Sequence, residues 1–207
     1  MFLDKLPEKG LVGLSWFEHG FRNLTNSRRP VTKLEEIQGL KIRVEQNAVS
    51  IDTWTALGSN AVPMPFPELY TALEQKAVDG QENPYSTVDS AKFYEVQKYL
   101  SVTKHKYTPL VLILSKKFWD QLSADEKKVI QDAATEAAVY QRKANRDLNE
   151  QYLQSLKKVG MQINEVPAAE VARMRAKVQP VVDKYSTQIG GTLVKDLYGE
   201  IEKARKQ

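Results

Sequence analysis

The feature that most constrains this chain is one long helical pattern without a Gly or Pro. A capping box of Ser123 and Glu126 predicts its start, and the pattern runs to about Val159. Its apolar residues recur at helical spacing: Val129, Ala133, Ala137, Tyr140, Ala144, Leu148, Tyr152 and Leu156. At 1.5 Å per residue the helix would be roughly 50 Å long, which exceeds the diameter of a small lobe. It must therefore project, pair as a coiled coil or bridge two lobes, and its alanines favour close packing over a leucine seam.

Before this helix, short apolar runs alternate with short helical patterns. We expect strands at 11–17, 40–44, 61–64, 98–103 and 110–114, and helices at 50–57 and 68–76. The run 110–114 is apolar without alternation, which predicts burial on both faces. After the long helix we expect a strand at 161–166 and helices at 168–185 and 192–204. This order predicts an α/β protein with a βαβ-type layered sheet.

Composition excludes several classes of protein. The 207 residues include no cysteine, so disulfides, zinc ribbons, iron–sulfur clusters and thiol nucleophiles are absent. The net charge is only +4, from 30 basic and 26 acidic residues that are mixed along the chain, and we expect no nucleic-acid partner. No apolar run approaches the ~18 residues of a membrane span, and the N-terminus does not read as a secretory signal.

A search for catalytic chemistry gives little. The two histidines, His19 and His105, stand in no ligand cluster, and we expect each to be a loop residue with a local hydrogen bond. Phosphate-binding loops and the nucleophile-elbow pattern are missing, so we expect no metal, no cofactor and no enzyme. A hydrolase or isomerase that uses Glu68 and Glu82 as paired carboxylates stays an alternative, without a poised base to support it.

Four residues have the chemistry to bind a small organic anion. Arg43 ends a strand of Leu, Ile and Val, where layered α/β sheets bind ligands, and its guanidinium can hold a carboxylate with two hydrogen bonds. Arg22 lies among small polar side chains that suit either a polar solute or a turn. Asn83 could bind a polar group or cap the next helix, and Phe66 sits between prolines, where an aromatic is either core or presented to a ligand.

Several segments together resemble a known family, the DctP-type extracytoplasmic solute receptors of TRAP transporters. They are Gly20-Phe21-Arg22-Asn23, Gly39-Leu40-Lys41-Ile42-Arg43-Val44, Ala56-Leu57-Gly58 with Val62-Pro63-Met64, Phe66 with Glu68 to Glu74, Val78 to Pro84, and Lys92 to Tyr99. Their order and spacing make the resemblance specific, and it covers nearly the whole chain.

The resemblance implies a periplasmic-binding-protein-like architecture of two α/β lobes with a long lobe-spanning helix. It also implies a periplasmic receptor that binds a small organic acid, such as a C4-dicarboxylate or sugar acid, and delivers it to TRAP membrane permease subunits. In the family an arginine that matches Arg43 binds the carboxylate, and one that matches Arg22 supports it. Residues matching Phe66 and Asn83 complete that side of the cleft, and Asn47 also matches.

By the same resemblance the chain lacks most of lobe one. We expect 1–103 to form mainly lobe two, 104–145 to contribute a hinge strand and the start of the long helix to lobe one, and 146–207 to return to lobe two. The surface that would face lobe one should be apolar and exposed, which predicts self-association. The alternative to a receptor is an interaction module whose long helix assembles with partner helices.

Overall fold

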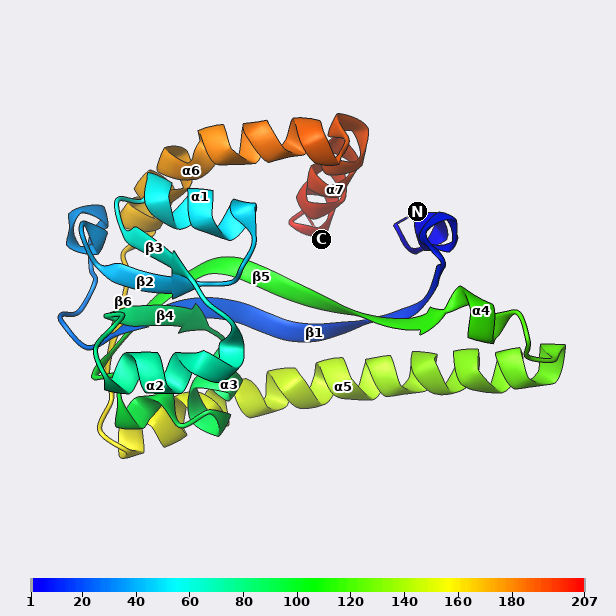
Figure 1. Cartoon of the computed structure of the whole chain (residues 1–207), viewed down its shortest axis with the longest axis horizontal. Helices are drawn as coiled ribbons and strands as arrows, with labels where there is room; N and C mark the ends of the chain where they lie inside the picture. Colours follow the sequence, from blue (N-terminus) through cyan, green and yellow to red (C-terminus); the bar gives the residue numbers. More distant parts are fainter. Residues whose placement is uncertain (1, 207) are drawn as a thin grey trace. The chain divides into compact units, whose positions relative to one another are not determined.

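The structure is a computed structural model that describes residues 2–206 (Figure 1). Six strands form one sheet in the order β3-β2-β4-β1-β5-β6. The strands are β1 (Leu11–Asn26), β2 (Lys41–Val44), β3 (Asn60–Pro63), β4 (Gly80–Asn83), β5 (Tyr99–Ser115) and β6 (Gln162–Glu165). The α-helices are α1 (Ala48–Ala56), α2 (Leu69–Glu74), α3 (Tyr85–Ser90), α4 (Lys116–Trp119), α5 (Ala124–Lys158), α6 (Ala168–Ile189) and α7 (Gly191–Ala204). The 3-10 helices are η1 (Leu3–Lys9), η2 (Leu34–Ile37), η3 (Phe66–Glu68) and η4 (Phe93–Glu95).

The chain divides into two compact units. The first unit contains the N-terminal residues up to Asn23 together with Asn83–Lys92 and Lys104–Gly160. The second unit contains Leu24–Glu82, Phe93–Thr103 and the residues from Met161 onward. These units do not coincide with the predicted ranges 1–103, 104–145 and 146–207, because residues of the N-terminal part cluster with the long helix. The assignment of those ranges to lobes stays a prediction.

The second unit has the βαβ arrangement that the sequence predicts. β2 pairs in parallel with β3, with Arg43 opposite Val62, and in parallel with β4. Their crossovers need helices, and α1 and α2 supply them. β5 and β6 are also parallel. The buried core beneath these strands contains Leu24, Val31, Ile37, Leu40, Ile42, Val44, Trp54, Leu57, Val166 and Met174.

Gly80 begins β4 at a position where no side chain fits. A Cβ atom there would lie 2.2 Å from the carbonyl oxygen of Thr25, a backbone atom that cannot move aside. The φ of Gly80 is not positive, so an unusual backbone angle is not the reason for glycine at this position. Close approach of two strands is therefore the reason for glycine here.

Helix α5 in the first unit confirms the long helical pattern. Ser123 is its N-cap, and Ser123 and Glu126 form the capping box, with the Glu126 amide donating to Ser123 Oγ at 3.2 Å. The predicted apolar stripe is correct at Leu156, which is buried, but wrong nearer the start of the helix, where Val129 is 68% and Tyr140 is 75% exposed. The buried residues are Ala134, Ala138 and Leu156. Small side chains face inward because α5 packs closely on strand β1 through hydrogen bonds.

Side chains of α5 satisfy backbone groups of β1, beside which it runs (Figure 1). Gln141 accepts from the Glu18 amide at 2.9 Å and donates to the Glu18 carbonyl at 2.8 Å. Arg142 donates to the Trp16 carbonyl, and Gln131 donates to the Leu14 carbonyl. Backbone N–H and C=O groups inside a protein need hydrogen-bond partners, and side chains of α5 provide some of them for β1. Periodicity alone points to the apolar residues, so it misses a helix face that binds through amides and arginine.

β5 corrects a second expectation. The predicted strands 98–103 and 110–114 are one continuous strand, Tyr99–Ser115. Leu110 and Ile113 are each 44% exposed and Leu112 is 37% exposed, so burial of this run on both faces is wrong. An apolar run indicates that a strand is suited to burial, but its side chains are buried only where another part of the structure packs against them. Among residues 2–206 these side chains stay uncovered.

We expect Ser123→Ala to lower the free energy of unfolding by about 1 kcal/mol, the usual cost of losing an N-cap oxygen. Thermal unfolding followed by circular dichroism measures the change. Ser123→Gly is the matched variant, since glycine is tolerated at an N-cap, and it should lose only a few tenths as much. An unchanged free energy of unfolding in Ser123→Ala would show that the Ser123 hydroxyl does not stabilise α5.

Candidate functional site

Arg43 is the centre of the candidate site in the second unit. It is the third residue of β2, between Ile42 and Val44, and only 4% of it is exposed. Because neighbours in a strand point to opposite faces, the apolar pair enters the core while Arg43 points the other way. The guanidinium therefore lies inside the protein and does not extend into bulk water.

The guanidinium of Arg43 is held by one backbone oxygen. Its Nε donates to the Met64 carbonyl at 2.9 Å, and its Nη2 donates to the same oxygen at 2.7 Å. The edge of the guanidinium that carries Nε and Nη2 is thus held by the segment that follows β3. The sequence does not identify Met64 as a partner of Arg43, because a carbonyl group is common to every residue and its direction depends on the fold.

Phe66 lies over the same guanidinium. The Cζ atom of Arg43 is 6.0 Å from the centre of the Phe66 ring, within the range of a cation–π contact. The ring also packs on Phe93 at 5.9 Å, and 47% of Phe66 stays exposed. The structure thus brings together two of the predicted residues, Arg43 and Phe66. An exposed ring beside a buried cation offers an apolar surface next to an anion-binding group.

Asn47 has a structural role in the same unit. It is the N-cap of α1, and its Oδ1 accepts from the Ser50 amide at 2.8 Å. A cap of this kind satisfies one of the unpaired amides at the start of a helix. A contact between Asn47 and a ligand stays a prediction.

The remaining predicted residues, Arg22 and Asn83, belong to the first unit. Arg22 lies within strand β1 and not in a turn, and 2% of it is exposed. Asn83 ends β4 and is 3% exposed. Asn83 does not cap α3, since Pro84 holds the N-cap position. Both side chains are buried polar groups, and their contact with a ligand stays a prediction.

A buried carboxylate, Glu18, lies on β1 in the first unit, and the sequence analysis did not single it out. Glu18 is 6% exposed, and its Oε2 accepts from Arg146 Nη2 at 2.6 Å and from the Tyr107 hydroxyl at 3.1 Å. Burial acts to raise the pKa of Glu18, but Arg146, Tyr107 and Asn145 outweigh it and hold that pKa below its ordinary value of 4.5. Burial beside Glu18 raises the pKa of Tyr107. The group is thus an ionised carboxylate that links β1, β5 and α5.

His19 lies on the same strand. Its Nε2 is 2.9 Å from the Thr87 hydroxyl of α3, so the expectation of a loop histidine with a local hydrogen bond is wrong. The partner is distant in sequence, and only the fold brings the two together.

The family is decided by comparison with known proteins. The profile of the family "Bacterial extracellular solute-binding protein, family 7" (DctP) matches residues 1–188. The chain belongs to this family. A curated DctP-family relative, the 2,3-diketo-L-gulonate-binding periplasmic protein YiaO of Escherichia coli, is 40% identical over 158 residues, 76% of this chain and 48% of that protein. The C4-dicarboxylate-binding periplasmic protein DctP of Rhodobacter capsulatus is 34% identical over 94% of this chain and 58% of its own length.

Solved DctP-family structures share the fold. The sugar acid binding protein DctPAm from Advenella mimigardefordensis, in complex with galactonate, is 50% identical and superposes with a TM-score of 0.94 over 98% of this chain and 66% of that chain. A TRAP periplasmic solute binding protein from Ochrobactrum anthropi is 51% identical, with a TM-score of 0.90 over 99% and 64%. The predicted α/β periplasmic-binding-protein-like fold is confirmed. The chain spans about half the length of the curated relatives it matches.

Membership of the DctP family decides between receptor and enzyme. The family consists of solute-binding proteins, so the alternative of a hydrolase or isomerase is wrong. The two carboxylates proposed for such an enzyme also differ in environment: Glu68 is exposed in η3, whereas Glu82 is 2% exposed in β4. Within residues 2–206, no group of three His, Asp or Glu side chains is placed to hold a metal ion.

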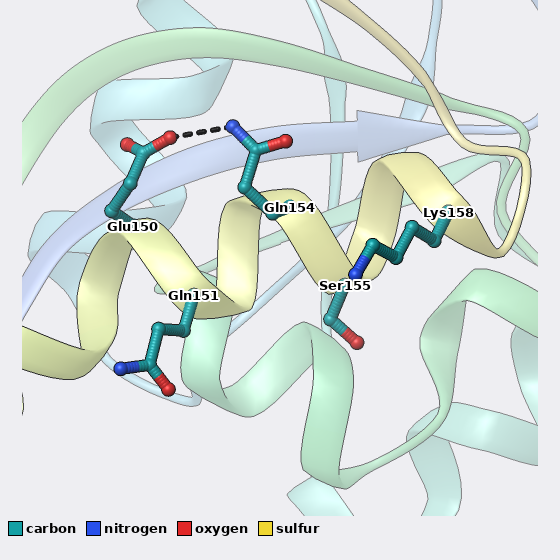
Figure 2. Close-up of a pocket in the computed structure, with 5 residues that line it drawn as sticks. All are labelled: Glu150, Gln151, Gln154, Ser155 and Lys158. Carbon is teal, nitrogen blue, oxygen red and sulfur yellow. Dashed lines mark hydrogen bonds between the residues drawn. The ribbon is translucent and has the colours of Figure 1, made fainter.

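A hollow at the C-terminal end of α5 is separate from these residues (Figure 2). Its volume is about 380 Å³, and it is lined by Glu150, Gln151, Gln154, Ser155 and Lys158. Gln154 donates to Glu150 at 2.6 Å, and Ser155 donates to Asp89 of α3 at 2.9 Å. The lining contains none of the predicted binding residues. The surroundings of Arg43, and not this hollow, are therefore the candidate site that is carried into the proposal below.

Proposed function

We propose that this chain is the ligand-binding part of an extracytoplasmic solute receptor of a TRAP-type secondary transporter. Arg43 binds the carboxylate of a small organic acid through an ion pair with two hydrogen bonds. The observation that carries this proposal is the position of Arg43, which is 4% exposed, anchored on the Met64 carbonyl and covered by the ring of Phe66. A buried, oriented guanidinium matches the fork of a carboxylate better than a lysine ammonium would.

The neighbouring residues suit the rest of such a ligand. Phe66 packs against its carbon skeleton, and closure around the ligand would strengthen the ion pair by excluding water. By resemblance Arg22 reinforces the positive charge, Asn83 binds an adjacent polar group and Asn47 lines the site. These three roles stay predictions.

Sugar acids are the ligand class that the relatives favour. The galactonate-bound protein is 50% identical to this chain, and the 2,3-diketo-L-gulonate-binding protein is 40% identical. The C4-dicarboxylate-binding relative is less similar, at 34%. A sugar acid carries one carboxylate for Arg43 and several hydroxyls for neutral hydrogen-bonding side chains.

Membership of the DctP family supports a proposed location and partner. We propose that the receptor works in the periplasm, where it delivers the acid to the membrane permease subunits. Within residues 2–206 no helix has both the length and the apolar character needed to cross a membrane.

Isothermal titration calorimetry with galactonate, 2,3-diketogulonate and succinate tests the proposed function. We expect saturable binding of at least one sugar acid and weaker binding of succinate. The neutral sugar galactose is the control and should not bind, because it offers Arg43 no carboxylate. Absence of binding for every acid would contradict the proposal.

The second candidate function is self-association. The apolar run of Leu110, Leu112 and Ile113 on β5 is exposed, as a surface that binds a protein would be. Sedimentation velocity at several concentrations, with and without galactonate, separates the candidates: a chain whose function is self-association through this run would associate whether or not the acid is present.

A further inference from the structure

We propose that Pro65 is a positioning residue, which makes residues 64–66 a rigid support that orients Arg43 before any ligand arrives. This inference rests on the proposed function, since it concerns the arginine that binds the acid. The segment reads Met64-Pro65-Phe66, directly after the end of β3 at Pro63, and it supplies two groups that contact the guanidinium: the Met64 carbonyl and the Phe66 ring.

Two hydrogen bonds from Arg43 meet at the Met64 carbonyl. Nε and Nη2 of Arg43 donate to one oxygen at 2.9 and 2.7 Å, so both hydrogen atoms on that edge converge on the Met64 carbonyl. Two converging bonds fix the plane of the guanidinium as well as its position. The direction of the Met64 carbonyl therefore contributes directly to the orientation of Arg43.

The backbone on either side of the Met64 carbonyl is restrained. Met64 precedes a proline, and the ring of Pro65 restricts Met64 to extended conformations. The Met64 amide donates to the Val44 carbonyl at 3.2 Å, which ties the segment to the residue next to Arg43 on β2. Pro65 itself has φ −58° and ψ 148°, the values that its ring prefers. The carbonyl direction is thus set locally, by strand β2 below it and by Pro65 after it.

The far end of the segment, at Phe66, is also anchored. The Phe66 ring packs on Phe93, which is 1% exposed. The Tyr70 hydroxyl of α2 donates to Glu95 of η4 at 2.6 Å, close in sequence to both rings. The segment is therefore held at both ends and stiffened by proline between them. A cation held in this way loses little rotamer freedom when it binds an anion, which strengthens binding.

Hydrogen exchange of the Arg43 Nε–H, measured by nitrogen-15 NMR on the ligand-free chain, tests the inference directly. In the wild type we expect slow exchange at Arg43 compared with the exposed Arg175 of α6. In Pro65→Ala we expect at least about tenfold faster exchange at Arg43, since Met64 gains freedom to turn its carbonyl away. Pro63→Ala is the matched control, because the residue that Pro63 restricts, Val62, is already held in the ladder with β2. It should leave the Arg43 exchange unchanged.

Wild-type exchange at Arg43 as fast as at Arg175, or unchanged exchange in Pro65→Ala, would overturn the inference. Melting temperatures of both variants check that they are folded, and the wild-type comparison of Arg43 with Arg175 needs no variant.

Galactonate titration adds the functional readout. We expect Pro65→Ala to bind galactonate roughly two- to tenfold more weakly than the wild type, and Pro63→Ala to bind it equally well. Equal binding by Pro65→Ala and the wild type would overturn the positioning role. If galactonate binds none of the variants, the proposed function fails for this acid, while the exchange rates still decide whether Pro65 orients Arg43.

Discussion

Arg43→Ala is expected to weaken galactonate binding by about 2–5 kcal/mol, the usual cost of truncating one partner of a desolvated charge pair. That range corresponds to a loss of roughly 30-fold to several thousand-fold in affinity. The loss should be large because Arg43 is 4% exposed. Removing it leaves the ligand carboxylate without an ion-pair partner in surroundings where little water can replace that partner. Isothermal titration calorimetry on the wild type and the variant measures the difference.

Arg28→Ala is the matched control for this variant. The Arg28 side chain is 64% exposed, and its contact with Asp79 at 3.8 Å is a surface ion pair. Such pairs contribute little, and this arginine lies in the loop after β1. We expect its removal to leave galactonate affinity unchanged. If Arg43→Ala binds every organic acid as tightly as the wild type does, Arg43 is not the carboxylate-binding residue.

Glu18→Gln is expected to lower the free energy of unfolding by about 1.5–3 kcal/mol at pH 7, the usual range for hydrogen bonds to a charged group. Glu18 is 6% exposed and accepts hydrogen bonds from Arg146, Tyr107 and Asn145. An amide of the same shape cannot form the ion pair, and its nitrogen would meet donors. Because the Arg146 side chain is 65% exposed, water screens part of the attraction, and we expect the lower half of the range. Urea unfolding followed by fluorescence measures the loss.

This loss should depend on pH with a defined sign. The pKa of Glu18 in the folded chain lies below its ordinary value of 4.5, so the unfolded chain binds the proton more tightly. The stabilisation by Glu18 is therefore complete above about pH 4.5 and disappears as the pH falls through the folded-state pKa. Wild type and Glu18→Gln should approach each other in stability over that interval.

Glu136→Gln, at an exposed position of α5, is the control for the Glu18 variant. It should change the free energy of unfolding by less than about 0.5 kcal/mol at both ends of the pH interval, pH 7 and pH 3. A difference between wild type and Glu18→Gln that stays constant from pH 7 to pH 3 would show that the stabilisation does not come from the ionised carboxylate.

Local chemistry made much of the fold predictable. The capping box at Ser123 and the helical spacing that follows it depend on neighbours in sequence, and α5 lies where these signals place it. The segments around Arg43 and Phe66 have an order and spacing specific enough to indicate the DctP family, which the family profile confirms.

Contacts between distant residues were not predictable in the same way. The inward face of α5 was misjudged because its partners on β1 are backbone groups, which leave no mark in the pattern of apolar residues. The run Leu110–Leu114 was expected to be buried, yet burial depends on what packs against β5 and not on the run itself. Glu18 and His19 find their partners more than 60 residues away, at Arg146 and Thr87.

The sequence by itself predicted most of the helices and strands, indicated the family and singled out Arg43 as the candidate carboxylate-binding residue, because residue type and short-range spacing carry that information. Only the tertiary structure decided how Arg43 is held. Its partner is the carbonyl of Met64, 21 residues further along the chain, and a backbone oxygen takes its direction from the parallel pairing of β2 with β3 and from the proline that follows it.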